Sequence, residues 1–415
     1  MGLTVVNTKT SLAKDHIKIT LLEGIHPSAE EVFRNDGYTN IFTAPKSLPA
    51  EELKKVIADT HFLGIRSRTQ VTESLLEHAP KLSAIGCFCI GTNQVDLNAT
   101  TLKGIPVFNA PFANTRSVAE LVLAEIILLL RGVPAKNAAA HRGEWQKSAL
   151  NSFETRGKVL GIVGYGHIGT QIGILAENLG MKVQFFDIDK KLSLGNARPA
   201  KSFHHLLNTS DVVTLHVPET EQTQNMMDSE AFKQLKQGAI LVNASRGTVV
   251  DIDALTDSLR TKKVHGAAID VFPTEPKSNQ DEFISPLREF DNTILTPHIG
   301  GSTKEAQVNI GIEVSEKLVK YSNNGTTLSS VNFPEVGLPE LDGKHRICHI
   351  HHNEPGILAK INDVFSETGV NISSQYLQTN SNVGYVVTDI DQTSSQEAFE
   401  GLKLIKGTIK NRILY

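Results

Sequence analysis

The chain has 415 residues, of which 40% are hydrophobic and 21% are charged, and its formal net charge is −4. This length exceeds what one hydrophobic core organises, so we expect two or three domains. The near-neutral charge argues against a nucleic-acid-binding protein, although local arginines remain able to bind small anions in a pocket.

The cysteines and the apolar runs favour a cytoplasmic protein. Cys87, Cys89 and Cys348 are too few and too badly placed for a disulfide framework. We interpret Cys87 and Cys89 as small core residues of a strand, because no second ligand pair accompanies them to bind a metal. The N-terminal residues lack an apolar signal core, and the most apolar run, residues 121–130, contains Glu125 and is too short to span a bilayer.

The N-terminal part of the chain alternates between strand and helix patterns. We expect strands at residues 17–22, near 40, 61–65, 82–89 and 105–108, and helices at 28–36 and 50–59. This alternation is typical of a parallel α/β unit. The strand at 61–65 brings Arg66, Ser67 and Arg68 to its carboxyl end, where the two arginines suit a phosphate or a second carboxylate. A solvated turn is the alternative.

A long apolar helix is predicted for residues 117–131. Ser117 and Glu120 form a capping-box pair at its start. Its uniform hydrophobicity predicts burial between domains or between subunits. A polar connection that contains the only tryptophan, Trp145, follows it.

Residues 158–189 follow the pattern of strand, glycine-rich turn, helix and second strand. Gly164 allows a tight turn, Gly166 the close approach of a diphosphate, and Gly169 close helix–strand packing. The new helix directs its free N–H groups at the phosphates. Asp187, at the end of the second strand, would accept hydrogen bonds from a ribose 2′-hydroxyl and repel a 2′-phosphate, so NAD is favoured over NADP. An ordinary βαβ glycine turn is the alternative.

The second α/β unit continues with strands predicted at 211–217, 239–243, 266–270 and 292–295. Strands this apolar are covered on both faces, as in a doubly wound parallel sheet. Ligands of such sheets gather at the carboxyl ends of the strands. That rule selects residues 244–246, 270–276 and 296–298.

Three side chains at these strand ends suit the oxidation of a 2-hydroxy acid. His298 is the candidate base for the hydroxyl proton that is removed as hydride leaves. Glu275 is the candidate acid that orients the imidazole, with a turn residue between two prolines as the alternative. Arg246 offers a planar fork to a substrate carboxylate, with a surface ion pair as the alternative.

The C-terminal part changes its pattern. Residues 304–321 predict an amphipathic helix, and residues 322–342 a crossing and a linker. Strands are then predicted at 345–351, 371–378, 383–389 and 408–414, and helices at 356–368 and 396–404. This βαββαβ order is typical of a ferredoxin-like module with an antiparallel sheet. His349 and His351 share one strand face and His352 faces away, so no metal site is expected there.

Four stretches resemble the D-isomer-specific 2-hydroxyacid dehydrogenases: residues 161–169 with Asp187, 243–247, 268–276 and 296–301. Residues 64–69, 84–96 and 331–334 resemble the phosphoglycerate-oxidising members that carry one C-terminal ACT domain. The implied fold is α/β, with two doubly wound parallel-sheet domains and a ferredoxin-like α+β ACT domain. Its expected limits are 1–113 with 303–341 for the substrate domain, 114–302 for the Rossmann NAD domain and 342–415 for the ACT domain.

The resemblance implies an activity and its control. The reaction is NAD-dependent oxidation of 3-phosphoglycerate to 3-phosphohydroxypyruvate, the first step of serine biosynthesis. Reduction of 2-oxoglutarate to 2-hydroxyglutarate is implied as a second activity. The resemblance also implies a cytoplasmic homotetramer that L-serine inhibits at ACT–ACT interfaces.

The resemblance also implies roles for individual residues. Arg246 binds the substrate carboxylate, Glu275 orients the histidine, and His298 is the acid/base. The cofactor contacts are Gly164, Gly166, His167, Ile168, Gly169, Asp187, Ala244, Ser245, Arg246, Asp270, His298 and Gly301. Further contacts are Arg66, Ser67 and Asn114 for the substrate, and His351, Asn353 and Asn371 for serine. Relatives often have an acidic residue and an arginine where this chain has His352 and Glu354, which changes the local charge of the serine site.

Two other functions stay open. A non-catalytic NAD-sensing corepressor could use the same fold, but it predicts a protein-docking cleft and has no use for an amino-acid-binding C-terminal module. A sibling dehydrogenase could act on glycerate or lactate, but these substrates lack the anionic tail that Arg66 and Arg68 suit.

Overall fold

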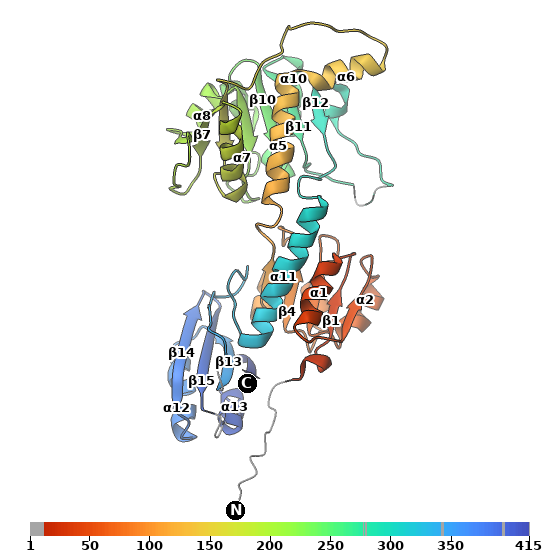
Figure 1. Ribbon diagram of the computed structural model, residues 1–415. Helices are drawn as coiled ribbons and strands as arrows, with labels where there is room; N and C mark the ends of the chain where they lie inside the picture. Colours follow the sequence, from red (N-terminus) through yellow and green to blue (C-terminus); the bar gives the residue numbers. More distant parts are fainter. Residues whose placement is uncertain (1–11, 277, 279, 342–343, 392–394, 415) are drawn as a thin grey trace, which may run out of the picture. The chain divides into compact units, whose positions relative to one another are not determined.

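The computed structural model describes residues 12–414 except for 277, 279, 342–343 and 392–394. The chain divides into two compact units, Met1–Ala113 with Gln307–Tyr415 and Asn114–Ala306 (Figure 1). In the part of the chain that is described, no helix is both long and apolar enough to cross a bilayer.

The first unit contains a parallel five-stranded sheet in the order β2-β1-β3-β4-β5. Its apolar strands separate two cores: α1 and α11 cover one face, and α2, α3 and α4 cover the other. The strands are β1 Ile19–Leu21, β2 Ile41–Thr43, β3 Phe62–Ile65, β4 Ala84–Cys87 and β5 Val107–Asn109. The helices are η1 Lys14–His16, α1 Pro27–Asn35, α2 Ala50–Ile57, α3 Glu73–Leu76, α4 Leu97–Leu102 and α11 Lys304–Asn324.

The second unit contains a parallel seven-stranded sheet in the order β12-β11-β10-β9-β6-β7-β8. Helices α5 and α7 lie side by side over one face, and α8, α9 and α10 cover the other (Figure 1). The strands are β6 Val159–Val163, β7 Lys182–Phe186, β8 Arg198–Pro199, β9 Val212–Leu215, β10 Ala239–Asn243, β11 Val264–Ile269 and β12 Thr293–Leu295. The helices are α5 Thr115–Leu130, α6 Val133–His141, α7 His167–Asn178, α8 Phe203–Thr209, α9 Ser229–Gln234, η2 Gly247–Val249, α10 Ile252–Arg260 and η3 Pro286–Glu289.

One local prediction in this unit is wrong. The capping box does not form, because α5 begins two residues before Ser117. The Ser117 hydroxyl instead lies 2.8 Å from that of Thr303, and Glu120 pairs with Arg116. The connection after α5 contains a helix that was not predicted, α6, with a proline in its first turn, where the missing N–H costs nothing.

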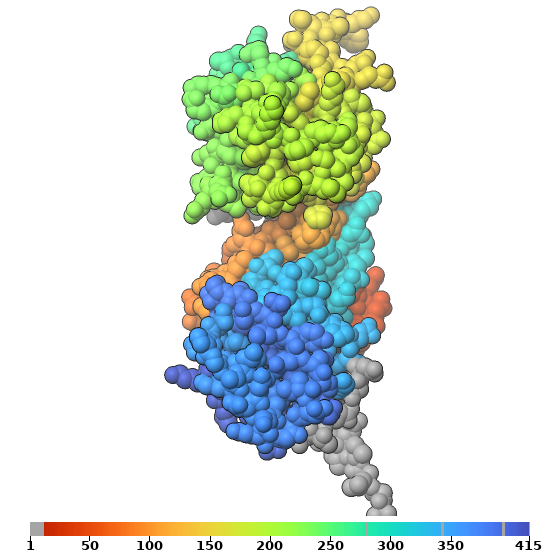
Figure 2. Space-filling view, turned by 90° about the vertical axis from the view of Figure 1, so that its left-hand side faces the viewer, coloured from red at the N-terminus to blue at the C-terminus, as the bar shows by residue number. Residues whose placement is uncertain are grey.

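The C-terminal module is a four-stranded antiparallel sheet in the order β14-β15-β13-β16. Its elements are β13 His345–His352, α12 Ile357–Glu367, β14 Ile372–Thr379, β15 Val383–Ile390, α13 Ser395–Lys403 and β16 Thr408–Leu414. Both helices pack on one sheet face, and the segment that contains Phe333 and Val336 covers part of the other. Figure 2 shows the module in blue, continuous with that segment in lighter blue. The predicted fold class is confirmed: two parallel α/β sheets and an antiparallel ferredoxin-like α+β module.

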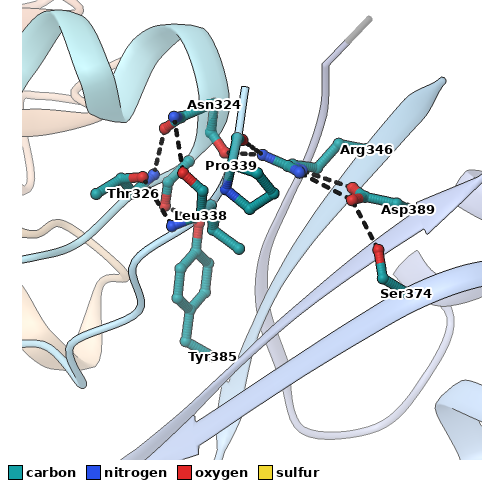
Figure 3. Close-up of polar contacts among 9 residues, drawn as sticks. Asn324, Thr326, Leu338, Pro339, Arg346, Ser374, Tyr385 and Asp389 are labelled. Carbon is teal, nitrogen blue, oxygen red and sulfur yellow. Dashed lines mark hydrogen bonds and ion pairs between the residues drawn. The ribbon is translucent and has the colours of Figure 1, made fainter. Parts of the chain in front are cut away.

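A buried ion pair joins this module to the chain before it (Figure 3). The Arg346 side chain is 1% exposed, and its Nε and Nη2 donate to the Asp389 carboxylate at 2.6 and 2.8 Å. Nη1 donates to the carbonyls of Asn324 and Pro339 at 3.0 and 2.9 Å. The Ser374 hydroxyl also donates to Asp389. Arg346 therefore connects the module's own sheet to the end of α11 and to the linker.

Candidate active site

A histidine and a carboxylate meet beyond the carboxyl ends of β11 and β12. Nδ1 of His298 lies 3.1 and 3.0 Å from the two oxygens of Glu275. The hydrogen bond to Glu275 raises the pKa of His298 above its ordinary value, against the opposing effect of burial. Burial alone would raise the pKa of Glu275, but the hydrogen bond and charge of His298 bring it below its ordinary value. With Nδ1 occupied by the carboxylate, Nε2 is the ring atom that can exchange a proton with a ligand.

Asp270 holds the turn that carries this histidine. Asp270 is 2% exposed, and its carboxylate accepts a hydrogen bond from the Thr296 hydroxyl at 2.6 Å. It also accepts from the backbone N–H groups of Ile299 and Gly300 at 2.8 and 2.9 Å. These three bonds stabilise a left-handed backbone at His298, whose φ is +55°. Such a conformation is costly for a non-glycine residue and persists only where the surroundings enforce it.

Arg246 lies close to the pair, just after β10. Its charge lowers the pKa of both His298 and Glu275. The Asn243 side chain fixes the turn between β10 and Arg246 by donating to the Arg246 carbonyl and accepting from Ser245. One guanidinium nitrogen, Nη1, donates to the Ser245 carbonyl at 2.7 Å. The structure thus brings Arg246, Glu275 and His298 together, as the sequence predicted.

The glycine-rich loop between β6 and α7 has the shape that a diphosphate requires. Gly164 has a φ of +89°, and a Cβ there would lie 2.2 Å from the His216 carbonyl oxygen. A Cβ on Gly169 would lie 2.2 Å from the Gly164 carbonyl oxygen. Gly166, by contrast, faces no protein atom within 4 Å among the described residues. No side chain caps the helix that begins there, and the N-terminus of a helix favours the binding of an anion.

Asp187 lies at the carboxyl end of β7 in a fixed orientation. One oxygen accepts from the N–H of Tyr165 at 2.8 Å, and the other accepts from the N–H of Asp189 at 2.9 Å. A carboxylate has about four lone-pair sites, so two remain for a ribose diol. Beside the loop lies an open hollow of about 530 Å³ whose lining includes His167 and Lys191. These residues fit the adenosine diphosphate part of a dinucleotide.

The remaining predicted contacts of this unit lie around the same sheet edge. Asn114 is the N-cap of α5, and its side-chain oxygen is buried without a hydrogen bond among the described residues. A Cβ on Gly301 would stand 2.2 Å from the Asn114 amide nitrogen, so glycine makes room for that side chain. Ala244 directly follows β10, and Ile168 is the second residue of α7.

The loop with Arg66 and Ser67 belongs to the other compact unit, directly after β3. Two polar residues that the sequence analysis missed hold it. The carboxylate of Glu23 accepts from the N–H groups of residues 68 and 69 at 3.0 and 2.8 Å, and the amide of Gln94 donates to the Arg66 carbonyl at 2.6 Å. The available signal was the position of Glu23 at the end of the neighbouring strand β1.

The three residues expected to bind serine do not meet within one C-terminal module. His351 lies near the end of β13 and is 4% exposed. Asn353 directly follows this strand, and its side-chain amide donates to the Asn380 carbonyl. Asn371 precedes β14, whose first residue pairs with the last residue of β15, whereas the end of β13 pairs with the first residue of β15. The length of β15 separates the two positions by roughly 23 Å.

Comparison with known proteins agrees with a dinucleotide-binding domain and with a separate C-terminal module. The family profile described as "D-isomer specific 2-hydroxyacid dehydrogenase, NAD binding domain" matches residues 123–300. The profile "AHAS small subunit-like ACT domain" matches residues 347–410. The crystal structure of D-lactate dehydrogenase from Aquifex aeolicus, complexed with NAD and lactic acid, is 27% identical with a TM-score of 0.66, and the match covers 77% of this chain and 100% of that chain.

Curated relatives match over nearly the full length of this chain. The D-3-phosphoglycerate dehydrogenases of Haemophilus influenzae and Escherichia coli K12 are each 61% identical, covering 99% and 98% of this chain and 100% of their own. D-3-phosphoglycerate dehydrogenase 1 of Saccharomyces cerevisiae is 47% identical, over 96% of this chain and 88% of its own. The chain is an NAD-dependent oxidoreductase with an ACT domain, and it belongs to the D-3-phosphoglycerate dehydrogenases, within the D-isomer-specific 2-hydroxyacid dehydrogenase family.

Proposed function

We propose that the protein oxidises 3-phosphoglycerate to 3-phosphohydroxypyruvate as the first step of serine biosynthesis in the cytoplasm. The observation that carries this proposal is the hydrogen-bonded pair of His298 and Glu275, next to Arg246, at the carboxyl edge of the Rossmann sheet. Oxidation of a 2-hydroxy acid needs three groups together: a base, a group that orients the base, and a group that binds the carboxylate.

The proposed reaction assigns one task to each side chain. The guanidinium of Arg246 binds the substrate carboxylate and so orients the adjacent C2 hydroxyl. His298 accepts the hydroxyl proton at Nε2, and Glu275 stabilises the imidazolium that results through its bond to Nδ1. NAD, when bound on the glycine-rich loop, supplies the acceptor for the C2 hydride. In the reverse direction, His298 returns the proton to the carbonyl oxygen. The same groups would reduce 2-oxoglutarate to 2-hydroxyglutarate, since that substrate also carries a carboxylate beside its carbonyl.

Arg66 and Ser67 are proposed to bind the phosphate end of the substrate, with Asn114 as a further contact. The bonds from Glu23 and Gln94 support this role, because they hold the backbone of the arginine loop in place. We assign residues 1–113 and 303–341 to the substrate domain, 114–302 to the NAD domain and 342–415 to the ACT domain. The compact unit formed by residues 114–306 supports this division.

L-Serine is proposed to inhibit the enzyme by binding between two ACT domains of a homotetramer. His351 and Asn353 lie at one end of the module and Asn371 at the other. A site that uses all three therefore needs His351 and Asn353 from one copy and Asn371 from a second. This requirement supports a site shared between subunits.

The decisive assay follows NADH oxidation with 3-phosphohydroxypyruvate, with and without L-serine at a concentration of about 1 mM, well above a micromolar affinity. We expect turnover that L-serine suppresses and D-serine does not. Hydroxypyruvate, which lacks the phosphate, should be the poorer substrate. Binding of NADH without turnover of any 2-oxo acid would favour the corepressor alternative, and a preference for pyruvate or hydroxypyruvate would favour a sibling dehydrogenase. Turnover that is insensitive to L-serine would remove the regulatory proposal alone.

A further inference from the structure

Helix α5 carries a buried carboxyl group that the proposed reaction does not use. Glu125 is 2% exposed. Neither of its carboxyl oxygens has a hydrogen-bond partner among the described residues. An ionised carboxylate in such a place would be strongly disfavoured, so the group is held neutral.

The position of Glu125 connects it to the catalytic turn. Val118, Glu125 and Leu129 lie on one stripe of α5, because positions separated by seven and by four residues share a helix face. A Cβ on Gly300 would lie 3.0 Å from the Asp270 carboxylate and 3.5 Å from Val118. A Cβ on Gly266, at the start of β11, would lie 3.1 Å from Leu129. The stripe therefore runs along β11 from Asp270 toward Gly266, and Glu125 lies within it.

One charged group contributes to the pKa shift of Glu125. Burial, and secondly the negative charge of Asp270, raises the pKa of Glu125 to about 8. Strand β10 carries no titratable side chain. The other titratable residues on elements packed against α5 are His265 on β11, Lys136 and His141 on α6, and His167 and Glu177 on α7. None of these contributes to the shift, so burial and the charge of Asp270 together account for the neutral state of Glu125.

We propose that Glu125 is a positioning residue of the dehydrogenase: its neutral carboxyl group leaves Asp270 and the 296–300 turn in place, and its ionisation disturbs that turn and ends turnover at alkaline pH. The ionised form places a second buried negative charge beside Asp270, whose three hydrogen bonds hold His298 in its left-handed conformation. This inference rests on the proposed function, because turnover is its main readout.

The oxidative direction isolates this effect from the titration of His298. There, His298 acts as a base, so its deprotonation makes turnover rise with pH. A fall at still higher pH must come from another group. Ionisation of Glu125 predicts such a fall above about pH 8, with kcat decreasing about tenfold per pH unit.

The test compares wild-type protein with Glu125→Gln in 3-phosphoglycerate oxidation between about pH 6 and pH 10, a range that spans both ionisations. Glutamine keeps the shape of the side chain and stays neutral. We expect the variant to match wild-type turnover at neutral pH within about twofold, and to keep that turnover where the wild type declines. Glu120→Gln removes a carboxylate from the exposed side of the same helix and serves as the matched control, which should decline like the wild type. An alkaline decline in Glu125→Gln that equals the wild-type decline would overturn the proposal.

A second measurement needs neither the variant nor the substrate. Infrared titration of the wild type should show a protonated carboxyl band that disappears at alkaline pH, in step with a weakening of NADH affinity. Absence of that band from the folded protein at neutral pH would also overturn the proposal. If the wild type does not oxidise 3-phosphoglycerate, the proposed substrate fails, whereas the infrared band and the NADH titration still decide the state of Glu125. Glu125→Leu, neutral and apolar, replaces the glutamine variant if that variant does not fold.

Discussion

His298 adopts a left-handed backbone conformation and reaches a carboxylate 23 residues earlier in the chain. Its sequence neighbourhood predicted the residue type and the strand end, because ligand sites of parallel sheets occur there. The neighbourhood could not predict that the Asp270 carboxylate holds the turn around His298, because its hydrogen bonds reach residues 26 to 30 positions away. Glu23 and Gln94 were missed for a similar reason, since their role lies in contacts with distant backbone groups.

Glu275→Gln should shift the pH dependence of 3-phosphoglycerate oxidation. In the wild type, the bond to Glu275 raises the pKa of His298, so the basic form appears at higher pH than it would in an ordinary histidine. Loss of the carboxylate lowers that pKa, and the acidic limb of kcat/KM moves to lower pH while the plateau falls. His298→Asn is the comparison variant, with an expected loss of about 10²- to 10⁴-fold in kcat. An unshifted acidic limb in Glu275→Gln, or a loss of NADH binding in His298→Asn, would show that these roles are misassigned.

At the scale of elements, the C-terminal module and most strands were predicted closely because their periodicities are strong, whereas the two-residue strand β8 was not predicted. The observed β10 and β16 have the predicted limits of 239–243 and 408–414. Helix α6 was missed because its alanine-rich sequence has no pronounced polar and apolar faces. The capping box failed since the motif does not specify where the helix begins: Ser117 lies inside α5, and contact with Thr303 satisfies its hydroxyl.

Gly166→Ala should separate cofactor binding from stability. No described protein atom lies within 4 Å of a Cβ at this position, and its φ of −81° suits alanine. The thermal midpoint should therefore stay near the wild-type value, while the methyl group displaces the diphosphate and weakens NADH affinity by about tenfold or more. Gly164→Ala places a Cβ against the His216 carbonyl and strains a backbone of positive φ. This variant should lose both stability and NADH binding. Wild-type NADH affinity in Gly166→Ala, measured by fluorescence titration, would place the diphosphate elsewhere.

For the whole molecule, the connection between the C-terminal module and the chain before it includes a buried ion pair. Arg346 satisfies Asp389 within the module and two carbonyls outside it (Figure 3). A buried pair of this kind tolerates the removal of one partner poorly, because the other charge then stays buried and unpaired.

Arg346→Ala should destabilise the C-terminal module without affecting the NAD site. We expect a cost of about 3–5 kcal/mol, the range for breaking a buried ion pair, seen as an earlier calorimetric transition. NADH affinity should remain within about twofold of the wild type, since the NAD site belongs to the other compact unit and sites that share no partners act additively. Lys54→Ala, which removes an exposed pair with Glu51, is the control and should change little. An unchanged unfolding profile in Arg346→Ala would show that the ion pair does not stabilise the module.

The sequence by itself determined the parallel and antiparallel sheets, the glycine loop, the acidic residue after β7, and the types of residue at the strand ends. These properties follow from side-chain periodicity and from backbone sterics, both of which act over a few residues. Only the tertiary structure decided that Glu275 meets His298, that Asp270 fixes the catalytic turn, and that Glu125 is buried. Those outcomes depend on distance and desolvation, which arise when segments far apart in the chain pack together.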